Sequence, residues 1–80
     1  MSNEVKKILS MFDGLFVITI LESSKNYLVH FCRNRNTVET ETDNIAAVDK
    51  KTFKVSSFSY FDEPAEYTEA CENVVYRYDR

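Results

Sequence analysis

The sequence predicts a single α+β domain over residues 1–80, with a four-stranded antiparallel sheet and one helix at each end, in the order α-β-β-β-β-α. Three observations predict this class. Eighty residues are enough for one hydrophobic core and too few for two. Apolar residues recur at helical spacing near both ends of the chain, and four short β-branched or aromatic segments lie between them. The balance of 44% hydrophobic and 29% charged residues is typical of a folded chain.

The first helix is expected over about Asn3–Asp13, with Ser2 or Asn3 as its N-cap. Gly14 follows it and can take the left-handed conformation that ends a helix. The apolar residues of this segment form one stripe at positions i, i+3, i+4 and i+7: Val5, Ile8, Leu9 and Phe12.

A β-hairpin is expected from Leu15–Glu22 and Tyr27–Arg33, joined by a turn that pairs Glu22 with Tyr27. This register gives two faces, and both are largely apolar. One holds Phe16, Ile18, Ile20, Val29 and Phe31; the other holds Val17, Thr19, Leu21, Leu28, His30 and Cys32. Because a sheet with one side in water has a polar face, either the two helices cover opposite faces or a second copy of the chain covers one.

A second hairpin is expected after a polar loop, Asn34–Asn44, in which Thr37–Thr42 is an alternative short edge strand. Its strands are Ile45–Asp49 and Phe53–Phe58, folded over the turn 49–52 with Val48 opposite Phe53. The core face then holds Ala46, Val48, Phe53 and Val55. Phe58 falls on the wrong side of this pattern, which predicts a bulge or strand end near residues 56–57.

The turn carries the pattern Asp49-x-x-Thr52-x-x-Val55. It resembles the D-x-x-T-G-x-V hairpin near the end of PepSY-type domains and of many unrelated β-proteins. Phe53 occupies the position at which that pattern has a glycine in a left-handed turn conformation. The resemblance spans residues 49–55 and carries no function to this chain.

The final helix is expected from about Glu63 to Val75, capped by Asp62 and with Pro64 in its first turn. A helical wheel divides it into two arcs. The apolar arc holds Tyr67, Ala70, Cys71, Val74 and Tyr78, and the polar arc holds Asp62, Glu66, Glu69 and Asn73. Tyr76 and Tyr78 predict that part of the C-terminal tail packs on the domain.

Negative charge is concentrated in two blocks without bases, residues 36–49 and 61–73, although the net charge is only −3. Such blocks disfavour direct nucleic-acid binding and membrane-surface binding, and they favour a basic protein partner or serve solubility alone. The candidate partner-binding residues are Glu39, Glu41, Asp43, Asp62, Glu63, Glu66, Glu69 and Glu72.

Catalytic and metal chemistry find little support. His30 and Cys32 share one face of a strand, but side chains two positions apart are about 7 Å from each other, which is long for a nucleophile–base pair. One histidine and two distant cysteines, Cys32 and Cys71, do not make a zinc site. The sequence therefore predicts no catalytic residue, no metal and no cofactor, with a thiol or hydrolytic enzyme using His30 and Cys32 as the alternative.

These observations favour a small acidic, non-enzymatic protein-binding module, most simply an inhibitor or antagonist of the immunity-protein or phage anti-defence kind that imitates the charge of nucleic acid. The alternative from another class is a structural homodimer without a charge-driven partner. Two unpaired cysteines, the lack of a signal-peptide pattern and the short apolar run Leu15–Leu21 predict a cytoplasmic protein.

Overall fold

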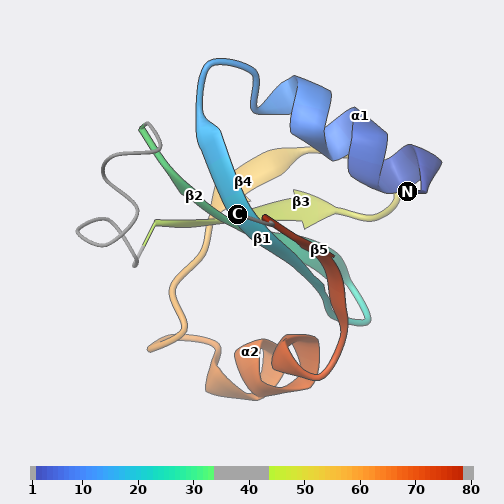
Figure 1. The fold of residues 1–80 in the computed structure, drawn as a ribbon. Coiled ribbons are helices and arrows are strands. Elements are labelled where there is room, and N and C mark those ends of the chain that lie inside the picture. Colours follow the sequence, from blue (N-terminus) through green and yellow to red (C-terminus); the bar gives the residue numbers. More distant parts are fainter. Residues whose placement is uncertain (1, 34–43, 79–80) are drawn as a thin grey trace.

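The computed structural model describes residues 2–33 and 44–78 and contains an antiparallel sheet with a helix on each face (Figure 1). The helices are α1 (Asn3–Met11) and α2 (Pro64–Cys71). The strands are β1 (Phe16–Glu22), β2 (Asn26–Cys32), β3 (Ile45–Asp49), β4 (Val55–Ser57) and β5 (Val74–Arg77), in the spatial order β4-β3-β2-β1-β5. The predicted α+β class is confirmed, but the sheet has five strands instead of four.

The fifth strand replaces the end of the predicted final helix. The helix ends at Cys71, and Val74–Arg77 pairs antiparallel with β1. The carbonyl of Asn73 accepts a 2.9 Å hydrogen bond from the amide of Glu22, and the amide of Tyr78 donates a 2.8 Å bond to the carbonyl of Ile18. The two valines and the tyrosine of this segment favour an extended chain. The free edge of β1 also has backbone groups that need partners, so the segment leaves the helix and joins the sheet.

The start of α2 also differs from the prediction. Glu63, not Asp62, precedes the first helical residue, Pro64, and its side chain makes no capping hydrogen bond. Proline disfavours the helical conformation in the residue before it, which places Asp62 two positions outside the helix. The amides of Asp62 and Glu63 instead bond to the carbonyl of Ser59, at 3.2 and 3.1 Å. A tight turn therefore leads into α2.

Helix α1 follows its prediction closely. The Ser2 hydroxyl accepts a 3.2 Å hydrogen bond from the amide of Val5, and Gly14 has a φ of +89°. The helix ends at Met11, two residues before the predicted end. Its apolar stripe packs on one face of the sheet in a core cluster made of Val5, Ile8, Phe12, Val17, Ile20, Val29, Ala46 and Val48.

The register of the first hairpin is confirmed, with Glu22 opposite Tyr27 and Thr19 opposite His30. A β-bulge between Val17 and Thr19 then shifts the pairing. An extra residue in one strand reverses the alternation beyond it, so Val17 lies on the α1 face that the sequence assigned to Phe16. Phe16 packs instead against Tyr78, with ring centroids 4.6 Å apart. The prediction for these two neighbours is wrong for that reason.

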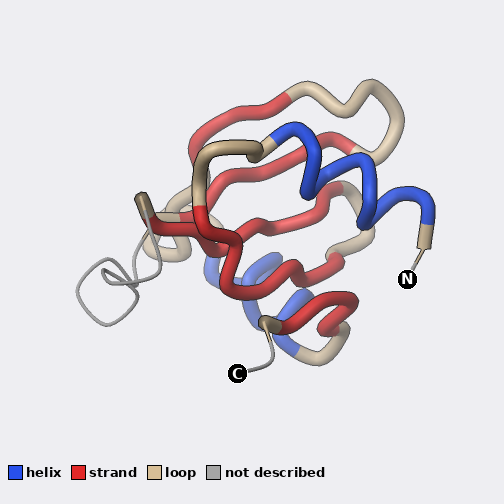
Figure 2. The backbone as a smooth tube through the Cα atoms, turned by 45° about the horizontal axis from the view of Figure 1, so that its top comes forward, coloured by secondary structure: helices blue, strands red, loops and turns tan. Residues whose placement is uncertain are grey.

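The second apolar face of the sheet is covered by α2 (Figure 2). Its core cluster contains Leu21, Leu28, Ile45, Ala47 and Ala70, with Phe58, Tyr60 and Tyr67 packed against it. The sequence offered two explanations for a sheet that is apolar on both sides, and the structure shows the first of them: the two helices lie on opposite faces. Two residues of the predicted apolar arc behave otherwise: Cys71 and Val74 are exposed.

The β3–β4 connection is longer than predicted. Val48 lies opposite Val55, not Phe53, and β4 covers only Val55–Ser57. The strand end predicted near residues 56–57 is confirmed. The Asp49 carboxylate accepts hydrogen bonds from the amides of Lys51 and Thr52, at 2.7 and 3.0 Å, and these bonds hold the pKa of Asp49 below its usual value. Phe53 takes the left-handed conformation, with a φ of +58°.

Candidate partner-binding surface

Two of the predicted partner-binding carboxylates bind the protein itself. One oxygen of Glu66 accepts hydrogen bonds from the Ser23 hydroxyl, at 2.6 Å, and from the Asn26 side-chain amide, at 2.8 Å. A carboxylate oxygen of Glu69 accepts a 2.8 Å bond from the backbone amide of Ser24. Half of the polar arc of α2 therefore faces the β1–β2 turn and fastens the helix to it.

The β1–β2 turn explains why carboxylates are needed there. Ser23 is only 2% exposed, and its hydroxyl also accepts hydrogen bonds from the amides of Lys25 and Asn26. Buried polar groups need partners, and a carboxylate is a strong acceptor for a hydroxyl and an amide together. Glu66 and Glu69 lie three positions apart, on one side of a helix, so both reach the same turn.

Three of the predicted residues remain turned to solvent at the two ends of α2. Asp62 and Glu63 precede the helix, Glu72 follows it, and all three are exposed. Within residues 2–33 and 44–78, the ion pair is that of Lys50 with Glu22, and it includes none of these three acids. We call Asp62, Glu63 and Glu72 the α2 acidic surface. Glu39, Glu41 and Asp43 lie outside the described residues.

The charges at the two ends of α2 have opposite effects on the helix. Asp62 and Glu63 suit the partial positive charge of the N-terminus, whereas Glu72 lies at the C-terminus, where an acid is unfavourable. The last turn of the helix contains no basic residue that would offset it. Helix stability therefore explains the first two acids and leaves the third unexplained.

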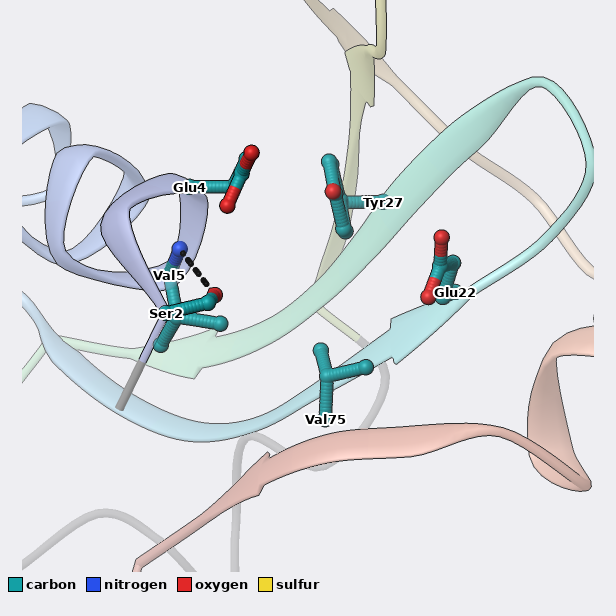
Figure 3. Close-up of a pocket in the computed structure, with 6 residues that line it drawn as sticks. All are labelled: Ser2, Glu4, Val5, Glu22, Tyr27 and Val75. Atoms are coloured by element: carbon teal, nitrogen blue, oxygen red, sulfur yellow. Dashed lines mark hydrogen bonds between the residues drawn. The ribbon is translucent and has the colours of Figure 1, made fainter.

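A second acidic location, which the sequence interpretation missed, is a hollow of about 460 Å³ beside the start of α1 (Figure 3). It is lined by Ser2, Glu4, Val5, Glu22, Tyr27 and Val75. Burial, followed by the charges of Glu22 and Glu4, raises the pKa of Tyr27 above its usual value, while Lys50 acts in the opposite direction. The signal available in the sequence was the Glu22–Tyr27 pairing; Glu4 and Val75 come from opposite ends of the chain.

His30 and Cys32 occupy different environments. Cys32 is fully buried, and the half-buried ring of His30 lies 6.1 Å from the ring of Tyr67. Among the described residues, no three His, Cys, Asp or Glu side chains are grouped to hold a metal ion.

Neither helix of the described chain has the length and apolar character needed to cross a membrane. No protein-family model matches the chain, and comparisons with curated proteins and with solved structures found no match.

Proposed function

We propose that this chain is a small protein-binding module that acts without catalysis on a basic surface of another protein, as an inhibitor or antagonist does. The observation that carries the proposal is that the acids in and beside α2 fall into two groups with different surroundings. Glu66 and Glu69 fasten the helix to the β1–β2 turn, and the α2 acidic surface stays exposed at its two ends.

A helix held in this way fixes the backbone positions of the three exposed acids that flank it. Fixed groups lose little conformational entropy on binding. Acidic residues without bases among them, as in residues 61–73, attract a basic surface over a distance and give fast association that weakens with salt. Exposed carboxylates at the two ends of the helix can occupy the site on a basic protein that would otherwise bind nucleic acid phosphates.

The test compares two charge reversals with the same change in net charge. One variant carries Asp62→Lys and Glu63→Lys; the control carries Glu4→Lys and Asp13→Lys, at exposed positions on the α1 side. Immobilised wild-type chain and both variants are used to capture proteins from a cell lysate at low and high salt. The captured protein is then purified, and its affinity for each chain is measured by calorimetry.

We expect a basic protein to bind the wild-type chain and the α1-side control with similar affinity, more weakly at high salt, and to lose binding to the α2-side variant. Circular dichroism checks that both variants are folded. Equal binding to the two variants would contradict the proposal, because the position of the acids would then not matter.

A further inference from the structure

Phe61 is exposed to a degree that packing within the described chain does not explain. Its side chain is 80% accessible, whereas the other exposed large hydrophobic residues in the described ranges reach at most 46%. Single exposed apolar residues are common on protein surfaces, so exposure alone does not mark a binding site.

The Phe61 ring packs against the ring of its neighbour Tyr60. Its centroid lies 4.4 Å from that of Tyr60, and the Tyr60 ring lies 5.4 Å from the ring of Tyr67 on α2. The backbone is also fixed, because the amides of Asp62 and Glu63 both bond to the carbonyl of Ser59. An aromatic ring presented on a rigid turn loses little freedom when a partner covers it, and such rings are common interface anchors.

The residues next to Phe61 define the partner's chemistry. Asp62 and Glu63 follow it directly and are both exposed, so the ring stands beside two negative charges. The complementary surface is an apolar pocket bordered by Lys or Arg side chains. A guanidinium there can pair with a carboxylate and also lie over the aromatic face.

We infer that Phe61 is the apolar anchor of the interaction and that it inserts into an apolar pocket rimmed by basic side chains on another protein. The inference rests on the proposed function and adds the residue that carries most of the affinity. The acids then mainly set the association rate and its salt dependence, and the ring mainly sets the dissociation rate.

The probe is a phage-displayed library of random disulfide-cyclised peptides, selected in parallel against the wild-type chain and against Phe61→Ala. We expect peptides that combine Lys or Arg with an apolar residue to be enriched on the wild-type chain alone. The enriched peptides are synthesised, and their affinities are measured for the wild-type chain, Phe61→Ala, the double variant Asp62→Asn/Glu63→Gln, and Leu15→Ala as a matched exposed apolar control.

Phe61→Ala should weaken peptide binding at least about tenfold at every salt concentration, because an aromatic anchor is removed. The double neutralisation should weaken binding less and remove most of its salt dependence, and Leu15→Ala should leave binding unchanged. The high exposure of Phe61 means that its replacement should not disturb folding, which unchanged urea unfolding confirms.

Two outcomes separate the inference from the function on which it rests. If the double neutralisation weakens binding and Phe61→Ala does not, the acidic surface binds a basic partner without this anchor, and only the inference is wrong. If the same peptides are enriched on both chains and neither replacement changes their affinity, both the inference and the acidic-surface function are wrong. Failure to enrich basic apolar peptides on the wild-type chain also overturns the inference.

Discussion

Glu66 in α2 accepts a 2.6 Å hydrogen bond from the hydroxyl of Ser23, a residue 43 positions earlier in the chain. Ser23 is 2% exposed and begins the turn that joins β1 to β2. Ala70, one helical turn after Glu66 on the same side of α2, is buried in the core cluster between the helix and the sheet. The helix is therefore held by apolar packing and by a carboxylate, and Glu66, which the sequence placed among the candidate partner-binding residues, is part of the scaffold.

Replacing Glu66 should destabilise the fold. Glu66→Ala leaves the Ser23 hydroxyl and the Asn26 side chain without their shared acceptor, and we expect the free energy of unfolding to fall by about 2 kcal/mol. Glu66→Gln keeps an oxygen acceptor and should lower it by less. Urea unfolding followed by circular dichroism measures both values.

The control for this prediction is Glu72→Gln, which neutralises an exposed acid near the other end of the same helix. It should change the free energy of unfolding by no more than about 0.5 kcal/mol. If Glu66→Ala were as mild as this control, the carboxylate would not hold the helix.

The left-handed conformation of Phe53 should make the β3–β4 turn sensitive to residue type. A side chain with a Cβ costs about 1–2 kcal/mol in this conformation, and glycine avoids the cost. The ring also contributes, since it packs near Tyr27 and lies 4.0 Å from the Lys7 ammonium. Both Phe53→Ala and Phe53→Gly remove the ring, but only alanine still has a Cβ in the left-handed conformation. Phe53→Ala should therefore be less stable than Phe53→Gly by about 1 kcal/mol.

Thermal or urea unfolding measures the stability of Phe53→Ala and of Phe53→Gly. The stability of Phe53→Asn is expected between them, because asparagine tolerates the left-handed region better than alanine does. The same pair of replacements at Val55, in the extended strand β4, is the control. There alanine should be the more stable variant, because glycine brings only its entropic cost. If alanine were the more stable variant at both positions, the left-handed conformation of residue 53 would not determine the stability of the turn.

Local sequence patterns were sufficient for the parts of the fold whose interactions are local. The spacing of Val5, Ile8 and Phe12 identified α1, and a four-residue turn set the pairing of Glu22 with Tyr27. Apolar residues on both faces of the first hairpin indicated that both faces are covered. Each of these depends on residues close together in the chain.

Features that depend on contacts between distant parts of the chain could not be predicted from local sequence patterns. Val74–Arg77 continues the helical wheel of α2 and is also a good strand sequence, and only the free edge of β1 decides between them. The bulge near Ile18 could not be predicted, because β1 is apolar on both faces and its sequence has no polar alternation that a bulge would interrupt. Likewise, Glu66 and Glu72 look equivalent in the sequence, and the position of the β1–β2 turn separates a structural acid from an exposed one.

Tyr27, which lines the hollow beside α1, should make the stability of the fold depend on pH in the alkaline range. The pKa of Tyr27 is raised above 10.0, first by burial and then by the charges of Glu22 and Glu4. The folded state therefore keeps the phenol proton at pH values where the unfolded chain loses it. The stability that Tyr27 contributes is fully present below pH 10.0 and is lost as the pH rises through its folded pKa.

Spectrophotometric titration of phenolate in the wild-type chain, minus that in Tyr27→Phe, isolates this group. We expect its midpoint above pH 10.0 and a shift downward in Glu4→Gln, because one of the two nearby negative charges is gone. Asp13→Asn removes an acid outside the hollow and should leave the midpoint unchanged. A midpoint that is unchanged in Glu4→Gln would mean that burial and the Glu22 charge raise this pKa, and that the Glu4 carboxylate does not act on the hydroxyl across the hollow.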